Sequence, residues 1–241
     1  MPFIFDPVYL VLLVVIIAIT GWAAWRVRST YSRWAKVDSG INLSAYDFAR
    51  RLLDRQGLTN VQIEPTPGQL TDHYDPRRKI LRVSQSVAAG SLPTGAIVPA
   101  GPQLSVAAAA VIAHEVGHAL QDRQRDAWLT VRSFIVPAAT FGSSLAPWLI
   151  IAGIWLQLFQ LAVIGLIGFA IAFAFTLVTL PVEIGASARA LAFVDGLGMT
   201  GERQAGARAV LKAAAWTYVA AALTAMLTFL YYLSLVMGRR D

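Results

Sequence analysis

The feature that most constrains the fold is the stretch of residues 133–188, in which Glu183 is the single charged side chain. Residues 133–180 are long enough for two membrane-spanning helices, because one crossing needs about 20 apolar residues. Glutamines interrupt this stretch within residues 155–160, so the sequence predicts a helical hairpin that leaves one side of the membrane and returns to it. Glu183 is therefore predicted on the same side of the membrane as the chain that precedes the hairpin.

Two further uncharged runs, residues 8–25 and 213–237, predict one span each and bring the total to about four transmembrane helices. The chain is 56% hydrophobic and 14% charged, which excludes an ordinary soluble domain. Arg26 directly follows the first run and no cleavage site stands out, so we expect this run to remain as an anchor.

The basic residues predict the orientation of these spans. Fourteen lysine and arginine residues lie within residues 26–132 and four within residues 189–212, against two after the last span. The positive-inside bias therefore predicts a multi-pass plasma-membrane protein with its N-terminus outside and these two segments in the cytoplasm. The net charge of +6 follows the membrane topology, and we expect no nucleic-acid partner.

The chemistry is concentrated in residues 113–121, Ala-His-Glu-Val-Gly-His-Ala-Leu-Gln. On a helix, His114 and His118 project from one face about a turn apart and can share a metal ion. This H-E-x-x-H spacing is typical of zinc peptidases, in which the glutamate, here Glu115, is the base that acts on zinc-activated water. The apolar residues before it predict a buried zinc helix over residues 104–121, and Gly117 predicts a close contact with another segment.

The third metal ligand must be a histidine or a carboxylate, because the chain has no cysteine. A catalytic zinc keeps three protein ligands and one open position, and two histidines with one glutamate are an established set. The predicted topology makes Glu183 the natural third ligand, and the small residues 185–188 would let its helix approach the zinc helix. The alternative is a lone carboxylate at the end of a membrane helix.

The segment between the first span and the zinc helix predicts a small α+β domain. Residues 42–57 have helical spacing, with Asn42 or Ser44 as N-cap, and residues 61–64 and 79–84 are predicted strands joined as a β-hairpin. The hairpin is either structural or binds an extended substrate by strand addition. Residues 90–103, rich in proline and glycine, form either a lid or a plain connector, and residues 122–126 are expected to be exposed.

We therefore expect a mainly α membrane protein with about four transmembrane helices and a small cytoplasmic α+β metalloprotease-like domain, which contains the β-hairpin and the H-E-x-x-H helix. Pro181 is expected to mark a helix start or kink. The expected parts are an N-terminal transmembrane anchor (1–25), the cytoplasmic domain (26–132), a transmembrane hairpin (133–180), cytoplasmic helices with the third ligand (181–212) and a C-terminal transmembrane helix with its tail (213–241).

Several stretches of the chain resemble the YugP-like membrane zinc metallopeptidases, which are gluzincins related in layout to the HtpX-type proteases. The resemblance covers roughly residues 39–191, and its most specific element is the run Asp-His-Tyr-Asp-Pro at residues 72–76. It implies one zinc ion per chain, with His114, His118 and Glu183 as ligands and Glu115 as the base. The stretches that carry it are residues 57–63, 67–77, 81–84, 114–121 and 180–191.

Three residues near these motifs have open roles. Gly185 stands where the family is expected to have an aspartate that orients a ligand histidine, and another acid such as Asp72 is expected to substitute. His73 and Tyr74 are competing candidates for the donor that stabilises the oxyanion of the tetrahedral intermediate. The alternative for His73 is a turn histidine that hydrogen-bonds Asp72 or Asp75.

Together these features predict a membrane-embedded zinc endopeptidase that hydrolyses peptide bonds with zinc-activated water. Its partners would be membrane-associated protein or peptide substrates and the lipid bilayer. The alternative is a catalytically inactive zinc-binding scaffold or adaptor, against which the intact Glu115 argues. A transporter is disfavoured because the spans are nearly free of charged side chains.

Overall fold

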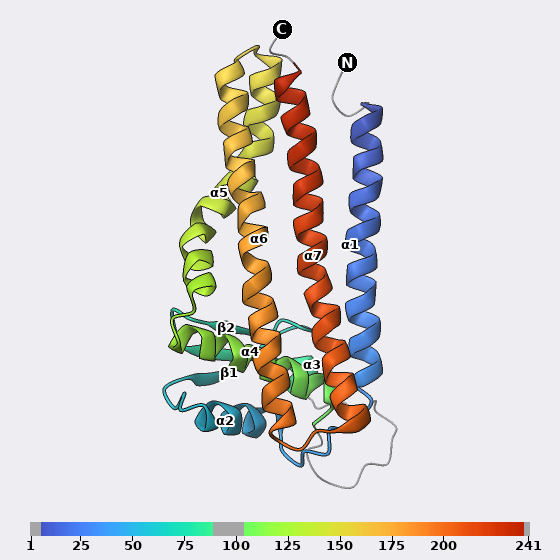
Figure 1. The fold of residues 1–241 in the computed structure, drawn as a ribbon, viewed down its shortest axis with the longest axis vertical. Coiled ribbons are helices and arrows are strands. Elements are labelled where there is room, and N and C mark those ends of the chain that lie inside the picture. The colour runs from blue at the N-terminus through green and yellow to red at the C-terminus, as the bar shows by residue number, and fades with distance from the viewer. Residues whose placement is uncertain (1–5, 89–103, 239–241) are drawn as a thin grey trace. The chain divides into compact units, whose positions relative to one another are not determined.

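The computed structural model describes residues 6–88 and 104–238, and it is mainly helical with one small sheet (Figure 1). The predicted lid or connector at residues 90–103 lies outside the described residues. In chain order the elements are α1 (Pro7–Trp34), α2 (Ala45–Arg55), β1 (Gln62–Thr66), β2 (His73–Asp75), β3 (Ile80–Ser84), α3 (Gln85–Ala88), α4 (Val106–Arg123), α5 (Ala127–Trp155), α6 (Phe159–Asp195) and α7 (Gly201–Met237).

Within the described part of the chain, the four helices α1, α5, α6 and α7 are long and apolar enough to cross a membrane. This finding confirms the predicted number of candidate spans. Helix α5 ends at Trp155 and α6 begins at Phe159, so the predicted hairpin turns where the glutamines interrupt the apolar run. The chain divides into a helical unit (Met1–Ala24, Ala127–Val182 and Trp216–Asp241) and a mixed unit (Trp25–Asp126 and Glu183–Ala215), which we describe separately.

Small residues and aromatic pairs hold the helical unit together. A Cβ atom added to Gly142 on α5 would lie 2.5 Å from the carbonyl oxygen of Gly168 on α6, so these helices pack backbone to backbone. Helix α5 crosses α6, and α7 lies between α6 and α1 (Figure 1). Aromatic contacts join α6 to α7 and α7 to α1, through Phe173 with Phe229 and through Trp22 with Trp216.

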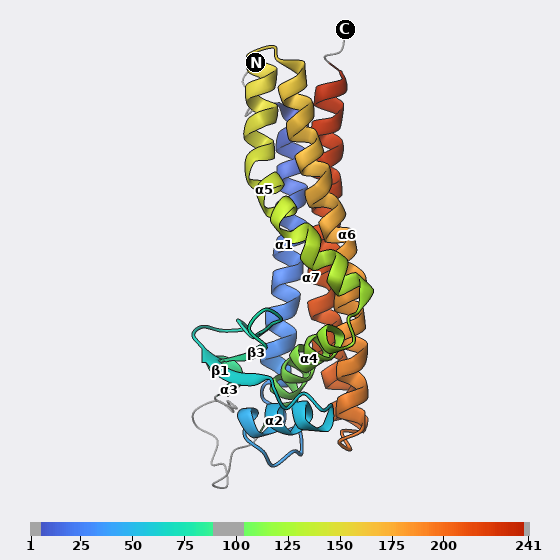
Figure 2. The ribbon, with the colours of Figure 1, turned by 90° about the vertical axis from the view of Figure 1, so that its left-hand side faces the viewer.

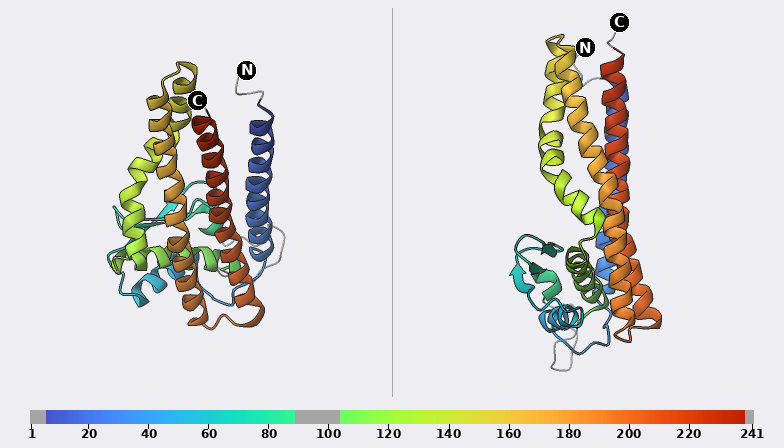
Figure 3. Two further views of the ribbon diagram at one scale, coloured as in Figure 1. Left: turned by 45° about the horizontal axis from the view of Figure 1, so that its top comes forward. Right: turned by 60° about the vertical axis from the view of Figure 1, so that its left-hand side comes forward.

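Helix α5 bends along its length, as both panels of Figure 3 show, and it contains Pro137 and Pro147. Proline removes a backbone donor and crowds the preceding turn, which accounts for the bend. Pro181 likewise lies inside a helix, because α6 runs through it to Asp195. The helix start predicted at Pro181 is therefore wrong.

The boundary predicted after residue 212, between the cytoplasmic helices (181–212) and the last span (213–237), falls inside one continuous helix, α7. The boundary was predicted from the sequence because charged residues give way to apolar ones after Lys212. Charged side chains favour water and apolar side chains favour the membrane, but this difference does not end a helix. No proline or glycine interrupts the backbone at this point, so the helix continues.

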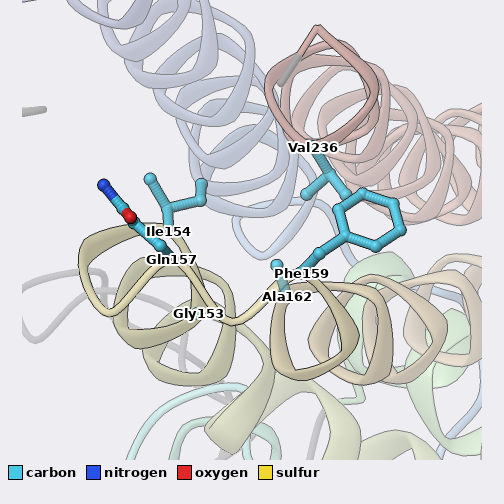
Figure 4. Close-up of a pocket in the computed structure, with 6 residues that line it drawn as sticks. All are labelled: Gly153, Ile154, Gln157, Phe159, Ala162 and Val236. Carbon is cyan, nitrogen blue, oxygen red and sulfur yellow. The ribbon is translucent and has the colours of Figure 1, made fainter. Parts of the chain in front are cut away.

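A pocket lies in the helical unit, where the turn between α5 and α6 meets the end of α7 (Figure 4). Gln157 contributes its one polar side chain, and none of the lining residues is titratable, so the pocket offers no catalytic group. The residues that line it are Gly153, Ile154, Gln157, Phe159, Ala162 and Val236.

The mixed unit is built on a three-stranded sheet with the order β1-β3-β2. Strand β1 pairs with β3 in parallel, and β2 pairs with β3 in antiparallel fashion. The hairpin predicted between residues 61–64 and 79–84 is therefore wrong in its partners, because those strands run parallel. The hairpin of this sheet is formed by β2 and β3, and β2 lies between the two predicted strands.

Helices α2, α3 and α4 pack beside this sheet (Figure 2). Of the two predicted N-caps, Asn42 and Ser44, helix α2 uses Ser44, whose hydroxyl accepts a hydrogen bond from the backbone N–H of Asp47. Its apolar face and alternate residues of β3, Leu81 and Val83, are buried in one core with α4. Since adjacent strand residues point to opposite faces, Arg82 lies on the outer face of the sheet.

Candidate metal centre

Helix α4 carries both histidines of the H-E-x-x-H box and is almost entirely buried. Ser105 caps it by accepting a hydrogen bond from the backbone N–H of Ala108, and the alanine and valine residues that follow pack on every side. The helix spans Val106–Arg123, close to the predicted residues 104–121. A buried helix fixes its side chains by packing, so the two histidines hold a defined orientation.

Gly117, between the two histidines, lets α4 touch α6. A Cβ atom added to Gly117 would lie 2.7 Å from the carbonyl oxygen of Ala186 and 3.2 Å from its Cα atom. The predicted close contact is thus confirmed, and it is a contact with backbone atoms. It brings Glu183, one turn earlier on α6, beside His114 and His118.

Replacing Gly117 with alanine is expected to destabilise the protein, because backbone atoms of Ala186 cannot move aside without separating the helices. We expect a loss of about 1–3 kcal/mol in the free energy of unfolding, together with weaker zinc binding. Thermal unfolding in detergent and zinc content measure the two effects. Gly21→Ala is the matched control, since nothing lies within 4 Å of a Cβ atom there, and equal stability of the two variants would contradict the prediction.

His114, His118 and Glu183 bring three ligand atoms to one point. Oε2 of Glu183 lies 3.1 Å from Nε2 of His114 and 3.4 Å from Nε2 of His118, and the ligand atoms of the three residues are all within 4.8 Å of one another. Neighbouring ligands of a tetrahedral zinc, at zinc–ligand distances near 2.0–2.1 Å, lie about 3.4 Å apart. The donor set and its spacing therefore fit a zinc ion.

Hydrogen bonds at the other ring nitrogens favour a cation at this point. Nδ1 of His118 lies 2.9 Å from Oε1 of Gln121, which can only accept, so Nδ1 donates and Nε2 of the neutral ring carries a lone pair towards Glu183. Two lone pairs that face each other repel unless a proton or a metal ion lies between them. Nδ1 of His114 contacts the hydroxyl of Ser187 at 3.3 Å.

The pKa of His118 shows the same preference for positive charge. Burial alone would lower this pKa, but the hydrogen bond with Glu183 and the negative charges of Glu115 and Glu183 raise it above its ordinary value. Glu183 is 2% exposed, so its charge acts on the histidines with little screening by water. A divalent cation would balance the negative charge of the same carboxylates while both histidines stay neutral.

Glu115 lies beside the cluster and is held by the sheet. The backbone N–H of Tyr74, on strand β2, donates to Oε2 of Glu115 at 2.9 Å. Burial raises the pKa of Glu115, and the nearby His114 and His118 oppose that rise. A raised pKa makes a carboxylate a stronger proton acceptor, which suits the role of a general base.

His73 and Tyr74, the two candidate oxyanion donors, lie on opposite faces of the sheet. Tyr74 points to α4, where its hydroxyl donates to Asp122 at 2.6 Å. His73 is exposed on the other face, with Nδ1 2.9 Å from the carbonyl oxygen of Thr71 and Nε2 3.1 Å from Arg82. The partners predicted for a turn histidine, Asp72 and Asp75, are therefore wrong. Both oxyanion roles stay predictions.

Several residues that shape the site were not assigned this role from the sequence. Asp122 is half-buried and binds Tyr74 and Lys79, although its segment was predicted to be exposed. Gln121 is fully buried and orients His118. Asp72, the expected substitute for an acid at position 185, instead accepts hydrogen bonds from the backbone N–H and the hydroxyl of Ser84. The sequence offers one signal for such a role, which is a polar residue, Gln121, in a helix that is otherwise predicted to be buried.

Comparison with known proteins agrees with this geometry. A family model described as "Putative neutral zinc metallopeptidase" matches residues 9–237. The chain belongs to this family. It is also 36% identical to "Putative membrane protease YugP" of Bacillus subtilis (strain 168), over 97% of this chain and 98% of that protein. The resemblance seen in the sequence motifs is thus confirmed for nearly the whole chain. No solved structure gives a significant match.

Proposed function

We propose that the protein is a membrane-embedded zinc endopeptidase that hydrolyses peptide bonds of membrane-associated proteins. The observation that carries this proposal is the meeting of His114, His118 and Glu183 at one point with the buried Glu115 beside them. Membership of a zinc metallopeptidase family supports it. Zinc bound by these three ligands would polarise the scissile carbonyl group and acidify a water molecule.

The chain's own groups then have distinct tasks. Glu115 accepts the proton of the attacking water at its carboxylate and passes it to the amine nitrogen of the leaving group. The backbone N–H of Tyr74 holds this carboxylate in place. Strand β2 lies at the edge of the sheet, and an extended substrate segment pairs with that edge by strand addition.

The proposed location of the site is the cytoplasmic side of the plasma membrane, with the N-terminus outside. The excess of basic residues within residues 26–132 supports this orientation. Helix α5 and the apolar part of α6 before Glu183 separate this residue from His118 along the chain, and two crossings in opposite directions put both residues on one side. The contact between these residues supports that topology. A site fixed at the membrane meets tails and loops of membrane proteins at high local concentration.

The decisive assay uses the full chain in liposomes, with one peptide sequence presented either on a membrane anchor or free in solution. We expect cleavage of the anchored peptide, loss of cleavage after removal of zinc with a chelator, and its return when zinc is added back. Stoichiometric zinc without cleavage of any member of a peptide panel would support the inactive scaffold instead. Equal cleavage of anchored and free peptide would overturn the preference for membrane-associated substrates.

A further inference from the structure

Gly185 lies on α6 two residues after the proposed ligand Glu183, and its missing side chain leaves room for a group from another helix. A Cβ atom added to Gly185 would lie 2.9 Å from Nε2 of Gln121 and 3.0 Å from Nη1 of Arg189. Real Cβ atoms essentially never come as close to another atom as this one would to Gln121, and the contact with Arg189 is tighter than most. The amide of Gln121 therefore occupies its observed position because residue 185 has no side chain.

The same amide holds His118. Gln121 follows His118 by three residues on α4, so the two side chains lie on one helix face. Its side chain is fully buried, with Oε1 2.9 Å from Nδ1 of His118. One end of the amide thus contacts a ligand histidine, and the other end abuts Gly185.

From this arrangement we infer that Gln121 and Gly185 form a positioning pair that sets the zinc affinity of the site. Gly185 leaves the space, and Gln121 uses it to fix the ring orientation and the protonated nitrogen of His118, so that Nε2 faces Glu183. The inference rests on the proposed zinc function and adds the residues that regulate metal affinity from outside the ligand set. Hydrogen-bond partners of metal-binding histidines typically change metal affinity by about 10- to 100-fold.

Gly185 differs in this respect from Gly117, although both glycines lie at the contact between α4 and α6. The atoms that block a Cβ at Gly117 belong to the backbone, whereas those at Gly185 are the ends of two flexible side chains. Such side chains can move without separating the helices. Alanine also favours helix more than glycine does. A methyl group at position 185 should therefore displace the amide and leave the fold intact.

The test measures zinc affinity of the full-length protein in detergent, by competition with a chelator, together with the melting temperature of the metal-free form. Gly185→Ala and Gln121→Leu are each expected to weaken zinc binding by about 10- to 100-fold. The metal-free melting temperature of Gly185→Ala should equal or exceed that of wild type. Gln121→Glu keeps an acceptor oxygen and should restore binding relative to Gln121→Leu. Gly196→Ala, where a Cβ atom meets only ordinary contacts, is the control.

The double variant Gly185→Ala with Gln121→Leu separates this inference from its rivals. If the methyl group at position 185 acts only by displacing the Gln121 amide, the two losses of zinc affinity are not additive. The double variant then binds zinc as tightly as the single variant with the lower affinity. Additive losses would assign the effect to Arg189 and overturn the inference, as would unchanged affinity in Gly185→Ala. A parallel fall in metal-free stability would show a packing role instead. Wild-type protein that binds no zinc would overturn the proposed function itself, which is a distinguishable result.

Discussion

Replacement of Glu115 with glutamine is expected to reduce peptide hydrolysis by about 10³-fold while zinc stays bound. A positioned general base typically contributes a factor of about 10²–10⁴ to the rate, and an amide cannot accept the proton. The glutamine oxygen can still accept the hydrogen bond that the backbone N–H of Tyr74 now gives to Glu115. The fold and the three ligands should therefore be unaffected.

The measurement pairs the turnover of an anchored peptide with the zinc content of the same preparation. Glu202→Gln, at an exposed position in the first turn of α7, is the matched control and should behave as wild type. Undiminished turnover in Glu115→Gln would remove the general base from the mechanism. Loss of zinc in this variant would instead show that Glu115 belongs to the ligand set.

Removal of the proposed third ligand should have the largest effect on the metal. Wild type is expected to hold about one zinc per chain, and Glu183→Ala close to none, because two histidines alone do not complete a catalytic zinc site. The substitution also removes a carboxylate that is 2% exposed and faces both histidines. Alanine is a good helix former, so α6 should persist.

His73→Ala is the control for this experiment, because it tests the one histidine outside the proposed ligand set. His73 is exposed on the outer face of the sheet and bonded to Thr71 and Arg82, so its removal should leave zinc content unchanged. If His73→Ala loses zinc and Glu183→Ala keeps it, the third ligand is wrong. The two-crossing topology would then lose its main support.

The parts of the fold that the sequence predicted depend on long, uniform signals. The break between α5 and α6 was visible because polar glutamines interrupt an otherwise apolar run. The pairing of the strands was not, since β2 has three residues, too few for a clear alternation of apolar and polar side chains. Without β2, the segments now seen as β1 and β3 looked like the two arms of a hairpin.

The candidate site also contains residues that the sequence predicts and residues that it does not. His114 and His118 follow from their spacing on one helix, and Glu183 from a count of membrane crossings. Asp122 takes its role from Tyr74 and Lys79, and the amide of Gln121 has room beside His118 because residue 185, on another helix, is a glycine. Such contacts appear only when the chain is folded, because no local pattern encodes which groups will meet.

The order of the ligands along the chain has a consequence for biosynthesis. His114 and His118 precede the α5–α6 hairpin, and Glu183 follows its apolar part, 65 residues after His118. A ribosome that has released the zinc helix has therefore not yet made the third ligand. In the proposed topology both hairpin helices must also enter the bilayer before the ligands can meet. The ligand set of the proposed protease is thus incomplete until the α5–α6 hairpin has been made and inserted.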